Sequence, residues 1–350
     1  MHEATLDRAP SSLPGYRRIF APDRLTLGLF FPIEAFQGDR PAMRDQVALA
    51  QGAEAANIAA LWVRDVPLRV PSFGDAGQVY DPWVWLGYIA AQTRRIALAT
   101  GAVVLPLRHV IHVAKAAASI DRLSGGRFVL GVATGDRPDE FPAFGRPFGS
   151  RGEMFREAVP VLMRLWSEDA PVLDSPLAVL HGEDVVPKPL ACRVPVLITG
   201  RSQQTLDWIA ASSDGWITYP RPEPAQIATV ALWRRTAASV APGAFKPFAQ
   251  SLYVDLVAGA DAPPTPIHLG YRLGAAALRD LLARLEDAGV HHVILNLKYG
   301  SRSARAVLDD LDAHVIGHFP AHPLDDTTTR IPEKETPCHC SSTSTSTSRG

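Results

Sequence analysis

Long apolar runs and cysteine are both scarce in this chain of 350 residues. Apolar runs such as residues 96–105 are too short for the ~20 residues that a helix needs to cross a bilayer. The three cysteines are too few and too unevenly placed to build a disulfide framework. The first residues also lack the basic and then apolar order of a secretion signal. We therefore expect a cytoplasmic protein with no membrane partner.

An excess of charge of either sign is missing as well. The chain has 35 Lys and Arg residues against 36 Asp and Glu residues, which leaves a net charge of −1. This balance indicates no nucleic-acid partner, because proteins that bind nucleic acids carry a surplus of basic residues. Apolar residues nevertheless make up 47% of the sequence, so a chain of this length can bury a large core.

Several motifs that announce a particular chemistry are also absent. No G-x-S-x-G sequence is present, which argues against an α/β-hydrolase. His109 and His112 lie one helical turn apart, but no Glu or third ligand completes a zinc pattern such as H-E-x-x-H. We therefore expect no metal site. No G-x-G-x-x-G follows the first apolar segment, which weakens the case for a dinucleotide-binding Rossmann fold.

Eight apolar segments alternate with stretches of helical character. They centre near residues 27, 60, 98, 129, 196, 217, 252 and 293. Strands that are apolar on both faces are typical of parallel sheets, in which helices join one strand to the next. Eight β/α units in strict alternation predict a TIM (β/α)8 barrel. A doubly wound α/β sheet is the competing arrangement.

The ends of the chain differ in composition from the barrel, which we place at residues 25–320. Residues 1–24 are rich in Pro, Ser and Arg without periodicity, so we expect an N-terminal extension whose order depends on docking. Inside the barrel region, a proline-punctuated stretch at about 170–192 predicts an excursion from the regular pattern. Residues 321–350 are low in complexity, so we expect a disordered tail.

One stretch predicts a βαβ unit with polar groups at one edge. It has an apolar strand over residues 96–105, a helix that ends at two glycines, and a second strand over residues 128–133. Ligands of a barrel bind at the carboxyl ends of its strands. We therefore expect a ligand at Thr100-Gly101 and at Thr134-Gly135-Asp136. A simple turn, with Arg137 solvated, explains the second group equally well.

The same rule selects residues after the other strands, namely Glu34, Asp65, Gly200 to Thr205, Tyr219 and residues 296–298. Gly200 to Thr205 has the clearest mechanism. At the start of a helix, a glycine with Ser and Thr close behind offers backbone N–H groups and hydroxyls that suit a phosphate. The alternative is that Ser202 only caps the helix.

The order of several motifs resembles one known family. T-R-R-I at 93–96, L-S-G-G-R-F at 123–128, E-F-x-x-F-G at 140–145 and the segment GRSQQTLDWIAASSDGW at 200–216 are similar to the bacterial luciferase-like flavin monooxygenases. The resemblance covers about residues 25–320. Within that family the chain resembles an uncharacterised luciferase-type subgroup.

The resemblance implies a TIM barrel that binds FMN, or the deazaflavin F420 in one branch, at the carboxyl ends of the strands. It places a strand-end bulge, often with a non-prolyl cis peptide, behind the flavin ring at Gly101-Ala102. The implied cofactor-binding residues are Thr100, Gly101, Ala102, Thr134, Gly135, Asp136, Gly200, Arg201, Ser202, Gln203 and Thr205. Arg201 and Gln203 depart from the small or acidic residues that the family often has there.

The family's catalytic histidine has no match, because Arg64-Asp65 stands after the second strand. Asp65 is therefore the one catalytic candidate, and luciferase chemistry itself does not transfer. The loops at 66–80, 137–150 and 259–274 are candidates for a lid that excludes water. The aromatic residues Phe30, Trp62, Trp83, Phe141 and Phe144 suggest an apolar or aromatic small-molecule substrate, and core packing is the alternative role for most of them.

The resemblance thus implies a flavin-dependent oxidoreductase, above all an FMN-dependent monooxygenase that uses O2 and reduced flavin. A separate NAD(P)H:flavin reductase is the implied source of that flavin, and a homodimer the implied assembly. Two alternatives stay open. One is an F420-dependent dehydrogenase on the same barrel, and the other is a non-catalytic flavin-binding protein.

Overall fold

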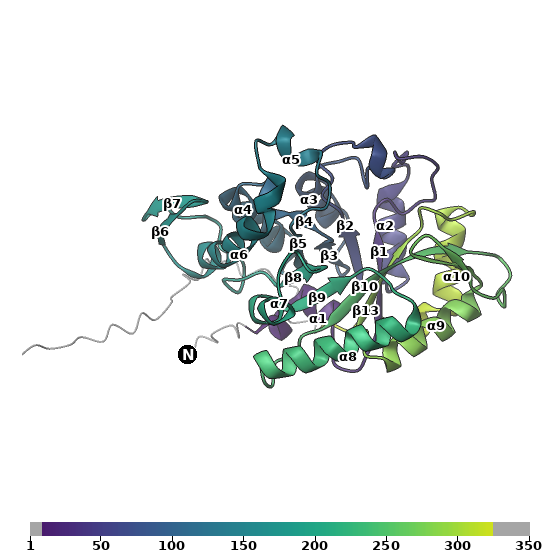
Figure 1. The fold of residues 1–350 in the computed structure, drawn as a ribbon. Helices are drawn as coiled ribbons and strands as arrows, with labels where there is room; N and C mark the ends of the chain where they lie inside the picture. The colour runs from purple at the N-terminus through teal and green to yellow at the C-terminus, as the bar shows by residue number, and fades with distance from the viewer. Residues whose placement is uncertain (1–8, 325–350) are drawn as a thin grey trace, which may run out of the picture.

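Eight parallel strands close into the barrel that the alternating pattern predicts (Figure 1). The computed structural model describes residues 9–324. Each barrel strand pairs in parallel with the next, and the last closes on the first, with His292 opposite Thr26. The barrel strands are β1 (Thr26–Phe30), β2 (Ala60–Val63), β3 (Ala97–Thr100), β5 (Phe128–Ala133), β8 (Val196–Thr199), β9 (Gly215–Thr218), β10 (Phe248–Leu256) and β13 (His292–Asn296).

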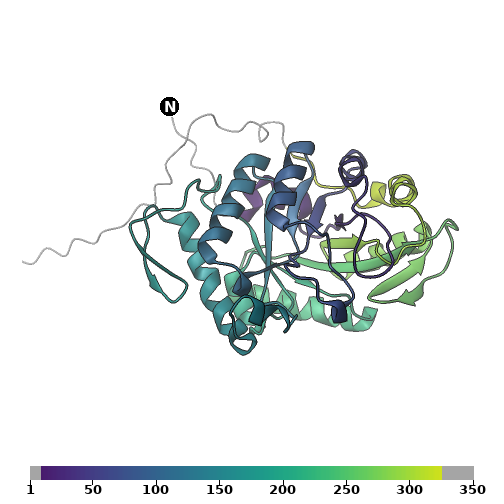
Figure 2. The same cartoon turned by 90° about the horizontal axis from the view of Figure 1, so that it is seen from above.

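A helix follows each barrel strand, and the helices lie around the outside of the strands (Figure 2). Asp81 caps its helix by accepting hydrogen bonds from the N–H groups of Trp83 and Val84, and Gly125 ends another at φ 69°. The eight helices are α2 (Gln46–Ala55), α3 (Pro82–Gln92), α4 (Val110–Ser124), α6 (Arg151–Ser167), α7 (Leu206–Ser212), α8 (Glu223–Val240), α9 (Ala275–Asp287) and α10 (Ala304–His314). None of the described helices is long and apolar enough to cross a membrane.

Short elements complete the described part of the chain. The excursion forms a hairpin of β6 (Val172–Ser175) and β7 (Ala178–His181), which projects from the barrel in both views (Figures 1 and 2). The remaining helical elements are α1 (Pro14–Ile19), α5 (Glu140–Ala143), η1 (Pro10–Ser12), η2 (Pro71–Phe73), η3 (Leu105–Leu107), η4 (Phe148–Ser150) and η5 (Ile316–His318), and a short strand β4 (Val103–Val104) pairs with β5.

The segment at 259–274, expected to be a loop, contains a second hairpin. Its strands are β11 (Thr265–Ile267) and β12 (Gly270–Leu273), and β12 extends the sheet beside β10. The two strands are too short to give a clear alternating pattern. Gly270 permits the pairing, because a Cβ there would lie 1.8 Å from the carbonyl oxygen of Tyr253.

The N-terminal segment packs against the bottom of the barrel, although its sequence indicates only an extension. Tyr16, Ile19 and Phe20 are buried and join the apolar cluster of the barrel interior. Helix α1 has six residues, too few to show a helical period in the sequence. At the other end, Ala321 is buried and its N–H donates to the carbonyl of Asn57. The rest of the expected tail, residues 325–350, lies outside the described residues.

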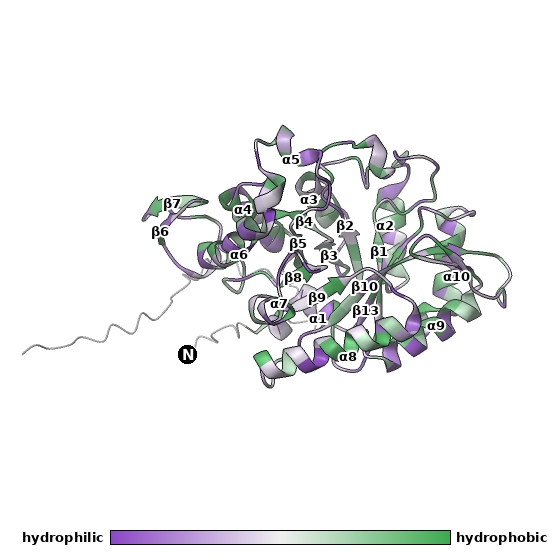
Figure 3. Cartoon of the chain, in the orientation of Figure 1, coloured by the Kyte–Doolittle hydropathy of each residue, from purple (hydrophilic) through white to green (hydrophobic). Residues whose placement is uncertain are grey.

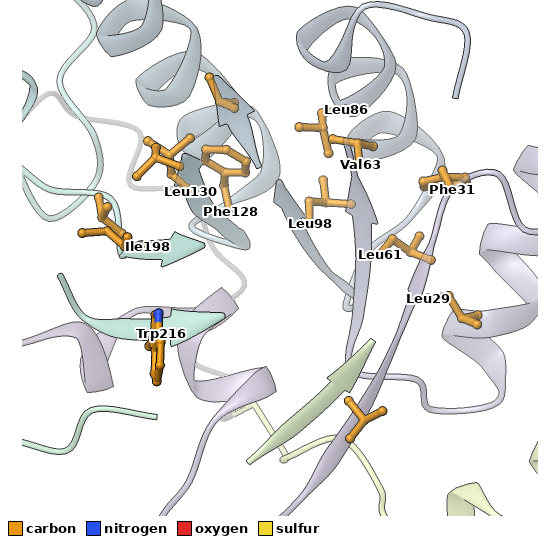
Figure 4. Close-up of a cluster of buried hydrophobic side chains, with 14 of the residues drawn as sticks. Leu29, Phe31, Leu61, Val63, Leu86, Leu98, Phe128, Leu130, Ile198 and Trp216 are labelled. Carbon is orange, nitrogen blue, oxygen red and sulfur yellow. The ribbon is translucent and has the colours of Figure 1, made fainter. Parts of the chain in front are cut away.

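Strand side chains alternate between two apolar layers. Leu29, Leu61 and Leu98 point away from the barrel axis toward the helices (Figure 4). The residues between them, such as Phe30 and Trp62, fill the interior. The outer helices carry both hydrophobic and hydrophilic residues, as α8 shows along its length in Figure 3.

A buried chain of hydrogen bonds crosses the barrel interior. The Thr26 hydroxyl donates to the carbonyl of Ile19, so it accepts from Nδ1 of His292 at 2.7 Å. The indole N–H of Trp62 donates to Nε2 of the same ring at 3.0 Å. Gly28 makes room for the pair, because a Cβ there would lie 2.5 Å from Nε2. The chain therefore fixes His292 as a neutral ring and fixes the orientation of Trp62.

This arrangement predicts a pH-dependent stability. Burial above all lowers the pKa of His292 to about 3, from about 6.5 in the unfolded chain. The neutral ring contributes fully to the free energy of unfolding above pH 6.5. This contribution is lost as the pH falls toward 3, because only the unfolded chain binds the proton in that range. Urea unfolding between pH 7 and 4 should show a shallower loss of stability in His292→Gln than in the wild type, by up to about 1.4 kcal/mol per pH unit. His314→Gln, at an exposed site, should keep the wild-type slope. An unchanged slope in His292→Gln would contradict the neutral buried ring.

Candidate active site

A cavity of about 480 Å³ lies at the carboxyl ends of the barrel strands. Its walls combine strand ends with the loop at 66–80 and the turn between β11 and β12. Ten of the residues selected from the sequence line this one cavity: Asp65, Gly101, Ala102, Thr134, Gly135, Asp136, Gly200, Arg201, Ser202 and Tyr219. The barrel thus brings together groups that are more than a hundred residues apart in the chain.

A bulge between β3 and β4 forms one wall of the cavity. Ala99 pairs with Val129, and Val103 pairs with Val132. Residues 100–102 therefore lie opposite only residues 130–131, and the extra residue pushes Gly101-Ala102 out of the sheet. The peptide bond between Gly101 and Ala102 is cis, as the resemblance implies.

Aromatic rings lie behind the bulge. A Cβ on Gly101 would lie 3.2 Å from Phe30 and from Trp62, so the backbone rests directly on these rings. Thr100 does not line the cavity. Its buried hydroxyl donates to the carbonyl of Gly131 and accepts from the N–H of Gly131, which ties β3 to β5. Because Gly101 has no side chain and Ala102 has only a methyl group, the bulge offers a flat stretch of backbone at one wall of the cavity.

The segment after β8, residues 199–203, presents a set of hydrogen-bond donors. Gly200, Ser202 and Gln203 have φ values of 60°, 44° and 56°. The backbone N–H groups of residues 201–203 donate no hydrogen bond within the described part of the chain. The buried Thr199 hydroxyl, at the same wall, has no partner among the described residues either. Backbone turns of this kind form concave sites for anions.

Thr205, not Ser202, caps the helix that follows. The Thr205 hydroxyl accepts the N–H of Trp208, and α7 begins at Leu206. The Ser202 hydroxyl donates to the carbonyl of Thr199 at 2.9 Å, so the interpretation of Ser202 as the cap is wrong. Neither Thr205 nor Gln203 lines the cavity, and their proposed contacts with a cofactor stay predictions. The loop itself, rather than the first turn of α7, carries the donors.

The segment after β5 is a tight turn against the barrel. A Cβ on Gly135, at φ 83°, would lie 2.7 Å from Val104. Thr134 is buried and Asp136 is exposed at the cavity wall. Arg137 is not solvated as a surface turn requires, because it is only 9% exposed. Its Nη2 donates to the backbone carbonyl of Asp75 at 2.9 Å.

Asp65, the catalytic candidate, is fully engaged in a salt bridge. Both of its carboxylate oxygens accept from Arg108 at 2.7 Å, and one also accepts from the N–H of Val104. Its side chain is 1% exposed. To accept a proton it would first have to leave Arg108. The pair instead anchors the start of the loop at 66–80 to the strand β4.

A cluster of Arg64, Asp75 and Lys298, here called the Asp75 cluster, was missed by the sequence argument except for Lys298. Arg64 donates to the two oxygens of Asp75 at 2.8 and 3.3 Å, and Nζ of Lys298 lies 3.6 Å from one of them. Burial raises the pKa of Asp75, but Arg64, the N–H of Gly77 and Lys298 together outweigh burial and lower the pKa of that carboxyl. The cluster holds the loop at 66–80 across the mouth. No sequence signal placed Asp75, because it lies within that loop and not after a strand.

Three aromatic residues at the mouth were also missed. Tyr253 lies inside β10, His268 lies in the turn between β11 and β12, and Tyr299 follows β13. Tyr219, which follows β9, was selected and lines the same cavity. Burial above all raises the pKa of Tyr253 to about 12, so its hydroxyl stays protonated. A polar aromatic residue within an otherwise apolar strand was the one available signal.

The aromatic residues first suggested for the pocket separate into three places. Phe30 and Trp62 lie behind the bulge, and Phe141 is buried in a small apolar cluster. Trp83 and Phe144 line a second cavity of about 850 Å³ beside α3 and α4. That cavity is larger but lies outside the barrel mouth. The strand-end cavity is the better candidate, because the unpartnered donors line it.

Comparison with known proteins supplies an independent finding. The family model described as luciferase-like monooxygenase matches residues 25–315. An uncharacterised protein of Mycobacterium tuberculosis is 39% identical over 160 residues, which cover 43% of this chain and 56% of that protein. The chain thus spans about half the length of these curated relatives.

Solved structures share the fold at low sequence identity. A monooxygenase from Streptomyces bottropensis superposes with a TM-score of 0.70 at 19% identity, over 84% of this chain and 99% of that one. An F420-dependent secondary alcohol dehydrogenase, in complex with an F420-acetone adduct, gives a TM-score of 0.69 at 18% identity, over 83% and 98%. At these identities the likeness concerns the fold alone.

Proposed function

The chain belongs to the luciferase-like monooxygenase family, and we propose that it is an FMN-dependent monooxygenase acting on a small organic substrate. One observation carries the proposal. A single cavity has unpartnered donors at residues 199–203 and the flat Gly101-Ala102 surface two strands away round the barrel. A phosphate fits the donors, and a planar ring system fits the flat surface.

The residues fit the cofactor both at the 199–203 loop and at the Gly101-Ala102 bulge. The buried Thr199 hydroxyl and the N–H groups of residues 201–203 lack partners among the described residues, and phosphate oxygens supply them. Gly101 lets the backbone lie directly on the Phe30 and Trp62 rings, where a side chain would clash. The bound flavin supplies the redox chemistry, including the activation of O2. The protein supplies binding, orientation and the exclusion of water.

Exclusion of water falls to the loop at 66–80. The Asp75 cluster and Arg137 hold it over the cavity through side-chain and backbone contacts. Lys298 contributes by donating to the carbonyl of Gly74 at 2.6 Å. A covered, water-poor site strengthens the electrostatic interactions inside it and limits side reactions of reduced flavin.

An F420-dependent dehydrogenase is the second candidate. F420 carries carboxylates beyond its phosphate. Arg201 belongs to the 199–203 loop, and its exposed guanidinium lies 5.9 Å from the ring centre of Trp216. Arg201 can pair with such a carboxylate. If FMN is the cofactor, we propose that a separate NAD(P)H:flavin reductase supplies it in reduced form and that the chain works as a homodimer.

Reconstitution tests the cofactor and the activity together. We expect the purified chain to bind FMN at micromolar concentration and, with NADH and a flavin reductase, to consume O2 faster when a substrate is present. Selective binding of F420 would favour the dehydrogenase. Flavin binding without any turnover would favour a non-catalytic flavin-binding protein. Failure to bind either flavin would refute the proposal as a whole.

Ser202→Asp tests the anion site directly. A carboxylate placed among the donors of residues 199–203 repels a phosphate, and aspartate tolerates the φ of 44° at this position. We expect flavin affinity to fall at least about tenfold, or ~1.4 kcal/mol, while the protein stays folded. Ser239→Asp, on an exposed position of α8, is the matched control and should bind as the wild type does. Equal affinity in the two variants would remove the phosphate role from this loop.

A further inference from the structure

Three rings form a continuous surface at one side of the cavity, here called the aromatic wall. Tyr253 and Tyr299 lie 5.0 Å apart between ring centres, and His268 lies 5.8 Å from each of them. The rings come from β10, from the β11–β12 turn and from the segment after β13. These elements lie two and three strands round the barrel from β8, whose end carries the 199–203 loop. The aromatic wall is therefore separate from the donors that suit a phosphate.

Two arginines in the same cavity keep N–H groups without partners. Nε of Arg64 and Nη1 of Arg137 are buried and donate no hydrogen bond to any described residue. Nη1 of Arg137 forms an ion pair with Glu140 at 3.9 Å, which is beyond hydrogen-bond distance. Both side chains line the cavity, and a guanidinium has five N–H groups, more than the contacts found here use. Both arginines thus have capacity for an acceptor.

The same arginines are held firmly in place by their other contacts. Arg64 donates to both oxygens of Asp75, and Arg137 donates to the Asp75 carbonyl while its guanidinium lies 4.5 Å from the ring centre of Phe73. A guanidinium fixed in this way loses little conformational freedom when it binds a ligand. The two guanidinium groups are therefore held in fixed positions before a ligand binds, unlike those of mobile surface arginines.

Charged side chains of both signs lie around these donors. Arg64 and Lys298 lie beside the carboxylate of Asp75, and Arg137 binds the backbone carbonyl of Asp75 and lies 3.9 Å from the carboxylate of Glu140. Asp136 is the exposed acid of the cavity, at the turn after β5. The tyrosine hydroxyls of the aromatic wall add further donors. Three cations thus lie near three acids, Asp75, Glu140 and Asp136, and the hydrogen-bonding groups that this side of the cavity adds are mainly donors.

We propose that the substrate is an aromatic carboxylate, whose ring packs on the aromatic wall and whose carboxylate binds Arg64 and Arg137. This inference rests on the proposed function, since it assigns the substrate class of the same site. An aromatic ring gains from stacking against Tyr253 and Tyr299, and a carboxylate accepts hydrogen bonds from the guanidinium groups of Arg64 and Arg137, which line the cavity. An aliphatic acid satisfies only the arginines, and a neutral aromatic compound satisfies only the rings.

Three probes of matched size test the assignment on the flavin-loaded protein. Benzoate carries both features, benzamide keeps the ring without the charge, and cyclohexanecarboxylate keeps the charge without the aromatic ring. We expect calorimetric titration to give benzoate an affinity at least about tenfold above that of either other probe, a difference of ~1.4 kcal/mol. Equal affinity for benzoate and benzamide would overturn the anion assignment, and equal affinity for benzoate and cyclohexanecarboxylate would overturn the ring assignment.

Two variants locate the binding. Arg137→Met should remove the preference for benzoate over benzamide, and Tyr299→Leu should remove the preference for benzoate over cyclohexanecarboxylate. Arg279→Met, on the outer helix α9, is the control and should keep both preferences. Thermal unfolding and flavin binding are measured on every variant. If Arg137→Met folds, binds flavin and still prefers benzoate, the site is not the one proposed.

Flavin binding in the same samples distinguishes a failure of the substrate class from a failure of the proposed function. A protein that binds flavin but shows no preference among the probes refutes the substrate class and leaves the proposed function standing. A protein that binds no flavin refutes the proposed function, and the assignment of the substrate falls with it.

Discussion

The close approach of two strands at Gly131 is the constraint on which the site depends. A Cβ there would lie 2.0 Å from the carbonyl oxygen of Thr100, so only glycine lets the strands meet. The Thr100 hydroxyl then bonds both the N–H and the carbonyl of Gly131. This clamp anchors the first residue of the bulge, and Gly101-Ala102 is thereby pushed out over Phe30 and Trp62. Behind them, His292 fixes Trp62, so the surface under the mouth is rigid to the depth of the barrel.

Charged contacts hold the outer part of the site, the loop at 66–80, whereas backbone geometry fixes the inner part, the Gly101-Ala102 bulge. One carboxylate, that of Asp75, draws together cations that follow β2 and β13, and its backbone carbonyl draws in Arg137. The loop at 66–80 is thereby closed by contacts that also set the positions of two arginines. Under the proposals made above, the loop that covers the cavity also positions the two arginines that bind the substrate. A change in the loop should alter the preference for substrates as well as access to the cavity.

Sequence reasoning located the barrel because apolar runs and helix caps are local signals. All eight strands lie where the segments predict, and Asp81 caps its helix as expected. The residues directly after strands were found for the same reason. Asp75, Tyr253 and His268 were not, since their roles come from a loop and a hairpin folding over the mouth. Ser202 shows what a local pattern cannot distinguish, because a serine before a helix looks the same in the sequence whether it caps the helix or lies in a turn.

The central claim is that one cavity holds a flavin by its phosphate at residues 199–203 and by its ring at Gly101-Ala102. A crystal structure of the protein soaked with the flavin that it binds tests this most directly. The account predicts phosphate oxygens within about 3 Å of the N–H groups of residues 201–203, and a ring lying against the bulge. Flavin bound in the larger cavity beside α3 and α4, or with its phosphate away from this loop, would contradict it.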